Sequence, residues 1–166
     1  MTAADLVRFH RLCRQYRALA IFMVVSVALI QALGHMIGPL VLQAMGRGRW
    51  PVADMIASAI WTAPVACYLF AVWSIGAAMG QLAQGRLIQP TLASALRKVG
   101  LALGIGGLLT VFVTLNLLRL VGQTHGGYLN FDVGGMTLGM IGGALFLLGR
   151  VIDQAGLVQA EMDEMI

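Results

Sequence analysis

The stretch Gln84-Gly-Arg-Leu-Ile-Gln-Pro-Thr-Leu-Ala-Ser-Ala-Leu-Arg-Lys-Val-Gly100 is a polar, basic and turn-rich interruption near the middle of an apolar sequence. Long apolar runs on both sides of it divide the chain into two halves of two hydrophobic segments each. Thr91 is a candidate helix N-cap. Leu92, Leu96 and Val99 share one helical face. We expect a short amphipathic helix here that leads into the third apolar segment.

The composition defines the class of protein. Of the 166 residues, 59% are hydrophobic and 11% are charged, and the mean hydropathy is +0.85. Soluble domains carry about 25% charged residues, so a soluble chain of this composition could not cover its surface. A membrane-spanning helix needs about 20 apolar residues, and the apolar runs fit four such spans. We predict an all-α polytopic membrane protein with four transmembrane helices and amphipathic cytoplasmic N- and C-terminal helices.

The predicted organisation has three parts. Residues 1–17 form a cytoplasmic amphipathic helix, residues 18–152 form the membrane domain, and residues 153–166 form an acidic helical tail. The four spans cover about residues 18–38, 55–82, 99–118 and 133–152. The third and fourth spans are joined by a polar connection.

The N-terminal segment is basic. Arg8, Arg11, Arg14 and Arg17 fall on one side of a helix and apolar residues fall on the other. This pattern is typical of a helix that lies in the membrane interface among anionic headgroups. A solvated basic lead-in to the first span explains the pattern equally well, and both interpretations place the segment in the cytoplasm.

The C-terminal segment is acidic and carries a narrow apolar stripe. Its acids include Glu161, Asp163 and Glu164. The stripe repeats at helical spacing and consists of Val151, Ala155, Val158, Met162 and Met165. An acidic helix gains nothing from an anionic lipid surface, so we expect it to bind a basic one. The N-terminal helix, the Arg97 and Lys98 pair, or a partner protein could supply that surface.

The distribution of positive charge predicts the orientation. With the N-terminus inside, the cytoplasmic side receives the larger group: Arg8, Arg11, Arg14, Arg17, Arg86, Arg97, Lys98 and Arg150. The outside receives Arg47, Arg49 and Arg119. Both termini and the central stretch are therefore predicted to be cytoplasmic. Topology explains the net charge of +4, and we expect no direct binding of nucleic acid.

Glycine spacing predicts where helices pack. GxxxG steps occur in three of the spans, and small residues at this spacing let helices approach closely. They are Gly76 and Gly80 in the second span, Gly100 and Gly104 in the third, and Gly135, Gly139 and Gly143 in the fourth. We favour packing inside one four-helix bundle. Self-association through the fourth span into a homo-oligomer is the alternative.

The sequence offers no pattern for catalysis or for a cofactor. It lacks GxSxG and HExxH motifs, and Cys13 and Cys67 lie in different environments without a metal-ligand spacing. We therefore expect neither an enzyme, a metal site nor a cofactor. Gln31 and Asn116 are expected to form hydrogen bonds between helices. With Thr62 they could instead line a path through the membrane, which is the alternative of a small transporter or channel subunit.

Parts of the chain resemble the bacterial domain-of-unknown-function 2975 family. The resemblance rests on Gly85 in a short loop, Leu96-Arg97 and Gly100 before the third span, and the acidic tail from Glu161 to Ile166. It implies a small four-span protein of the bacterial inner membrane and assigns no catalytic residues. We expect a structural or regulatory module that engages the lipid bilayer and a cytoplasmic or membrane partner.

Overall fold

The computed structural model describes residues 3–37, 41, 44–46, 52–84, 88–122 and 131–163. Its elements are all helical: α1 (Ala3–Ala32), the π-helical turn η1 (Leu33–Ile37), α3 (Val52–Ala83), α4 (Ile88–Leu108), the π-helical turn η2 (Leu109–Val113), α5 (Thr114–Leu120) and α6 (Val133–Asp163). The sequence predicts a short helix that leads into the third span, and the structure has one continuous helix from Ile88 into η2 and α5.

Four helical segments are long and apolar enough to cross a membrane: His10–His35, Ala53–Ala83, Pro90–Leu120 and Val133–Val158. The prediction of an all-helical chain with four such helices is confirmed. The α3 helix has 32 residues. At 1.5 Å per residue it is about 48 Å long, well beyond the ~30 Å of a hydrocarbon core. α3 is therefore longer than a perpendicular crossing of the hydrocarbon core requires.

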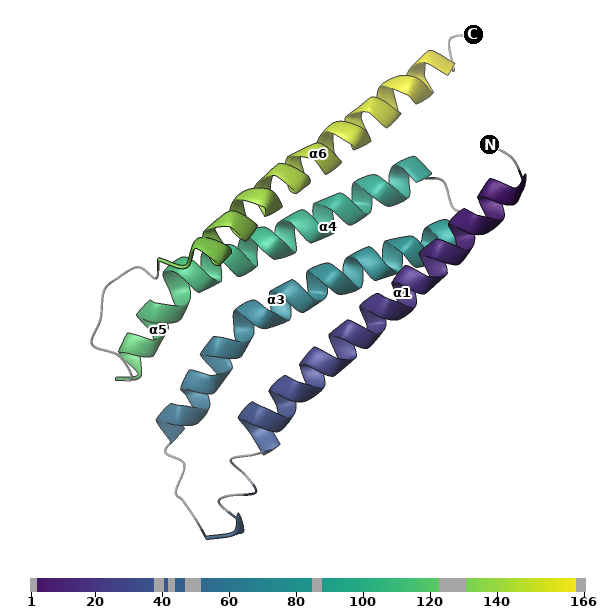
Figure 1. Ribbon diagram of the computed structural model, residues 1–166. Coiled ribbons are helices and arrows are strands. Elements are labelled where there is room, and N and C mark those ends of the chain that lie inside the picture. Colours follow the sequence, from purple (N-terminus) through teal and green to yellow (C-terminus); the bar gives the residue numbers. More distant parts are fainter. Residues whose placement is uncertain are drawn as a thin grey trace.

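The four long helices lie side by side in an open row (Figure 1). α1 packs on α3, α3 packs on α4, and α4 packs most extensively on α6. Within the described residues, α1 and α6 make no extensive contact with each other, so the bundle is not closed. Neighbouring helices are antiparallel, which brings both chain termini, the end of α3 and the start of α4 to one end (Figure 1).

The start of α4 differs from the sequence-based expectation. α4 begins at Ile88, so Thr91 lies inside the helix, where it is buried, and the predicted N-cap role is wrong. Pro90 falls within the first turn. Proline is tolerated there because the N–H groups of a first turn have no partner within the helix. An N-cap at Thr91 would make Leu92 the first helical residue, so the helix begins four residues earlier than that signal suggests.

The ends of α5 and α6 are fixed by specific backbone chemistry. Gly122 has φ 76° and donates its N–H to the Arg119 carbonyl at 3.0 Å. This left-handed conformation after a helix favours glycine. Before α6, the Asp132 carboxylate accepts hydrogen bonds from the N–H groups of Gly134 and Gly135, both at 3.1 Å. Asp132 is therefore the N-cap of α6.

The buried centre of the row consists of small and medium side chains. Ala71 on α3 and Val99 and Ala102 on α4 are buried, and Ile75, Leu103 and Leu145 pack against them. α3 also contains Pro64, whose missing N–H weakens the local helix. The ribbon of α3 changes direction in its first half (Figure 1). The core thus lies where α3, α4 and α6 meet.

Candidate functional site

Backbone contacts join α4 and α6. A Cβ added at Gly142 would lie 2.7 Å from the Gly100 carbonyl oxygen, and one at Gly100 would lie 2.6 Å from the Gly142 carbonyl oxygen. Farther along, a Cβ at Gly107 would lie 2.6 Å from the Gly135 carbonyl oxygen. No side chain fits at these positions without moving the opposite backbone. We call this contact the α4–α6 seam.

The predicted glycines of the third and fourth spans are not equivalent within the seam. Gly100 and Gly135 meet the opposite helix closely. A Cβ at Gly139 would lie 3.7 Å from the Cα of Gly107, which is ordinary contact, and a Cβ at Gly104 would meet nothing within 4 Å. Gly143 is exposed and also faces open space. Self-association through the fourth span would have to use this outward side.

Three seam glycines are absent from the predicted set: Gly107, Gly142 and Gly149. A Cβ at Gly149 would lie 2.9 Å from the Ala93 carbonyl oxygen. The seam on α6 follows Gly135, Gly139, Gly142, Phe146 and Gly149, which are alternately four and three residues apart. This is the spacing of a left-handed helix pair. That spacing on α6, unlike repeated steps of four, includes Gly142 and Gly149.

The contact between α1 and α3 also uses glycines. A Cβ at Gly76 would lie 3.0 Å from the Cβ of Ala20. At Gly80 a Cβ would lie 2.8 Å from the Nη1 atom of Arg17. The sequence predicts that Arg17 points away from the apolar side of its helix, but Arg17 follows buried Cys13 by one turn, and its side chain lies on α3. The arginine stem thus packs over a glycine.

Most of the described basic residues lie at the end that carries both termini, and Arg119 lies at the other end. Arg11, Arg14 and Lys98 are exposed. Arg97 donates from Nη1 to the Asp153 Oδ2 atom at 2.8 Å, which joins α4 to α6 by a solvent-accessible ion pair. Arg86 and Glu164 lie outside the described residues, as do the side chains of Arg8, Glu161 and Asp163.

The last part of α6 projects past the start of α4 (Figure 1). Val151 and Val158 of the predicted stripe are 59% and 56% exposed, and Ala155 is exposed as well. These three residues are therefore uncovered within the described part of the chain, and Met165 and the side chain of Met162 lie outside it. Asp153 is the tail acid for which a basic partner is seen, and that partner is Arg97.

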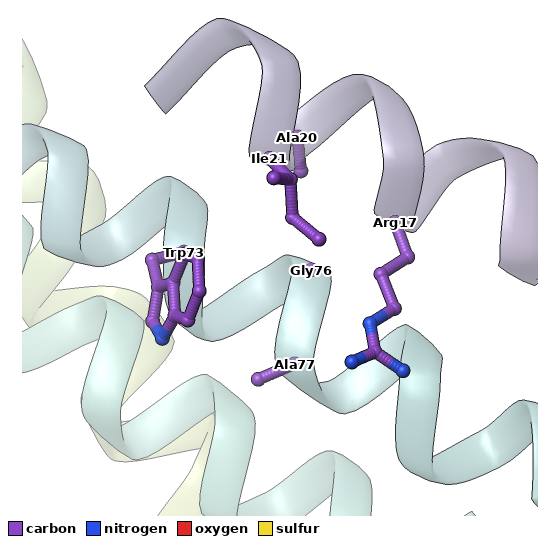
Figure 2. A pocket seen from close by; sticks show the side chains of 6 residues that line it. All are labelled: Arg17, Ala20, Ile21, Trp73, Gly76 and Ala77. Carbon is purple, nitrogen blue, oxygen red and sulfur yellow. The ribbon is translucent and has the colours of Figure 1, made fainter. Parts of the chain in front are cut away.

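Two hollows lie near the same end, on either side of α3. The first, between α1 and α3, has a volume of about 50 Å³ and is lined by Arg17, Ala20, Ile21, Trp73, Gly76 and Ala77 (Figure 2). The second, between α3 and α4, has a volume of about 180 Å³. Its lining includes Phe70, Trp73, Gln81, Thr91, Ser94 and Lys98. Both hollows share Trp73 and Ala77 of α3.

Polar groups within the spans form mostly local hydrogen bonds. Thr62 donates to the Ser58 carbonyl at 2.7 Å, and Asn116 donates to the Phe112 carbonyl of its own helix at 2.6 Å. The hydrogen bond described for Asn116 thus stays within its own helix, and its bond to another helix stays a prediction. Thr110 lies within η2, and its hydroxyl group is 3.2 Å from that of Tyr68, which links α3 to the third apolar segment. Among the described residues, no three His, Cys, Asp or Glu side chains could hold a metal ion together.

Comparisons with protein-family models, curated proteins and solved structures find no match for this chain. The resemblance to the domain-of-unknown-function 2975 family therefore stays a prediction. The geometry of the site offers helix surfaces, a basic end and two small hollows.

Proposed function

We propose that this protein is a structural or regulatory module of the bacterial inner membrane, with both termini in the cytoplasm, that binds a protein partner through the stripe on α6. The observation that carries the proposal is the projecting end of α6, whose apolar stripe is exposed at Val151, Ala155 and Val158. An exposed apolar stripe on a helix is a recognition surface for a groove in another protein. Acids along the same helix favour a basic rim around that groove.

Membrane insertion is supported by the four apolar helices and by their exposed surfaces. Many large apolar side chains on these helices face outward, among them Phe22, Ile30, Met140 and Leu147. An apolar surface of this extent is unsuited to water and suited to lipid. The cytoplasmic orientation is supported by the gathering of arginines at the end that carries both termini.

The partner is tested by a matched pair of substitutions in adjacent residues of α6. Val158 lies on the stripe, whereas Leu157 is 66% exposed and lies off it. Val158→Asp should abolish co-purification of the partner in mild detergent, and Leu157→Asp should retain it. Equal recovery of the same proteins with both variants would exclude the stripe as the binding surface. A chain shortened to residue 158 separates the contribution of the final acids from that of the stripe.

The orientation is tested with reporters. A reporter that is active only in the cytoplasm should be active when it is fused after Ile166. The same reporter should be inactive when it is inserted between α1 and α3. An external signal from the C-terminal fusion would refute the proposed topology and would leave the stripe facing the wrong compartment.

A small transporter or channel remains the alternative. Its support is the η2 turn beside the Tyr68 and Thr110 hydroxyl pair, because π-helical turns are frequent at functional sites. Thr62 and Asn116, the residues proposed to line the path, donate to carbonyls of their own helices. These hydrogen bonds occupy donors that a polar path would need, so they count against the alternative. Ion or solute flux in liposomes that contain the purified protein, lost in Tyr68→Phe, would favour the alternative.

A further inference from the structure

The face of the row that carries the two hollows is polar at one end and apolar at the other. In the larger hollow, Gln81, Thr91 and Ser94 supply polar groups from the end of α3 and the start of α4. Phe70 and Trp73 supply an aromatic surface, and their side chains are 53% and 49% exposed. Phe70 precedes Gln81 by 11 residues, a separation of about 16 Å along a helix. A ligand that fits both ends needs a polar head and an apolar chain.

Two cations flank this face. Arg17 of α1 lines the smaller hollow, and Lys98 of α4 lines the larger one. Figure 2 shows the Arg17 side chain extending from α1 towards α3, beside the turn that carries Gly76 and Ala77. The lining of neither hollow includes an acid. The cations thus approach the same helix from its two neighbours.

The charge of these two cations is not balanced within the described part of the chain. Neither Arg17 nor Lys98 has an ion pair among the described residues. The contrast with Arg97, the residue before Lys98, is direct. Arg97 is paired with Asp153 of α6, whereas Lys98 lies towards α3, where no acid lines the hollow. The face therefore favours an anionic ligand.

We propose that this face binds an anionic phospholipid, with its headgroup phosphate between Arg17 and Lys98 and an acyl chain along Trp73 and Phe70. Gln81, Thr91 and Ser94 are placed to donate hydrogen bonds to the headgroup oxygens. The long stems of Arg17 and Lys98 let their charges reach the headgroup region while the helices remain in the apolar layer. The inference rests on the membrane insertion proposed above, but it is independent of the stripe on α6.

The experiment uses Trp73 as a reporter in the full chain. The sequence has three tryptophans, so Trp50→Phe with Trp61→Phe leaves Trp73 alone. The protein is placed in nanodiscs that contain either brominated phosphatidylglycerol or brominated phosphatidylcholine at equal mole fraction. Brominated phosphatidylglycerol should quench Trp73 more strongly. Each lost cation should reduce the relative affinity for the anionic lipid about fivefold.

The decisive variant is Lys98→Gln, because Lys98 is exposed and its loss leaves the helix contacts in place. Arg17→Gln should act in the same direction, and Arg17→Lys should preserve the preference. Arg150→Gln is the matched control, since Arg150 is an exposed cation on α6 that lines neither hollow. The preference should persist in this control.

Several outcomes would overturn the proposal. Equal quenching of Trp73 by both lipids would exclude a selective site. Absence of quenching by either lipid, as expected if a second copy of the chain covers Trp73, would exclude it too. An equal loss of preference in Arg150→Gln would assign the effect to general surface charge. Displacement of the lipid by soluble glycerol phosphate at the same concentration would show that the site binds the phosphate alone and that the acyl chain contributes nothing. Failure to enter nanodiscs would refute membrane insertion itself, whereas entry without lipid preference would refute this inference alone.

Discussion

The two halves of the molecule pack by different means. Between α4 and α6, glycine backbones lie directly against each other, as at Gly100 and Gly142. Between α1 and α3, Gly76 meets the Ala20 side chain and Gly80 lies under Arg17. Burial follows a helix's place in the row instead: the most apolar part of the third segment, which packs between α3 and α6, is 33% buried, whereas that of α1 at the edge is 6% buried. One half is fixed by backbone contact, and the other is held through side chains that can move.

This difference has a physical consequence in a membrane. Lipid tails are as apolar as leucine, so helices there associate through close packing and not through the hydrophobic effect. Close backbone approach then gives a rigid pair, which suits α6 as a fixed support for its projecting end. A contact through the flexible Arg17 leaves α1 freer to adjust. We expect substitutions to disturb the two halves to different extents.

The largest effect is expected from Gly142→Ala. The added methyl group would lie 2.7 Å from the Gly100 carbonyl oxygen, so α4 and α6 must separate. Overpacking of this kind costs about 2–3 kcal/mol of unfolding free energy. Reversible unfolding in mixed detergent micelles, monitored by circular dichroism, measures the change.

The adjacent residue provides the control. Gly143 faces open space, so Gly143→Ala creates no clash. Replacing a helical glycine with alanine where it fits stabilises by about 0.4–1 kcal/mol, because the unfolded chain loses freedom. The two neighbouring substitutions should therefore have opposite signs. Equal effects would show that the seam does not run through Gly142.

Much of the fold follows from the sequence, but its lateral arrangement does not. Four apolar runs suffice to predict four long helices, because each run must satisfy its backbone groups within a helix. The side of each helix that packs on a neighbour cannot be predicted in this way, because the outward side is apolar too, as at Leu101 and Ile105 of α4. Composition therefore cannot distinguish an open row from a closed bundle.

The sequence likewise predicts some features of the candidate site and not others. The local charge pattern locates the basic end, and the spacing of apolar residues locates the stripe on α6. The position of Arg17 depends on Gly80, which lies 63 residues away in the sequence. A pattern within one helix holds no information about such a contact. The hollows beside Trp73 depend on three helices and escape local patterns for the same reason.

A smaller effect is expected from the contact between α1 and α3. Gly76→Leu places a large side chain where even a Cβ would lie 3.0 Å from the Cβ of Ala20, and should cost about 1–2 kcal/mol of unfolding free energy. Gly80→Ala meets the far end of the Arg17 side chain, which can turn aside, and should cost less. Crosslinking between cysteines introduced in α1 and α3 would report the separation. A greater loss from Gly80→Ala would show that Arg17 is held rigidly.

The start of α6 allows a third comparison, because one side chain fixes it. Asp132→Ala removes both acceptors for the N–H groups of Gly134 and Gly135 and should cost about 1 kcal/mol. Asp132→Asn keeps one carbonyl oxygen and should lose only part of that amount. Hydrogen exchange at these two amides measures the fraying directly. Unchanged exchange in Asp132→Ala would mean that the α4–α6 seam alone holds the first turn.

The smallest effect is expected where α4 and α6 meet through charge. The side chains of Arg97 and Asp153 are 52% and 36% exposed, so solvent screens their 2.8 Å ion pair. A double-mutant cycle with Arg97→Ala and Asp153→Ala should give a coupling of about 0.2–1 kcal/mol that falls as salt is added. Lys98→Ala is the control and should show no coupling to Asp153→Ala. A coupling larger than the cost of Gly142→Ala would reverse the order proposed here, because it would make the ion pair, and not the glycine seam, the principal link between these helices.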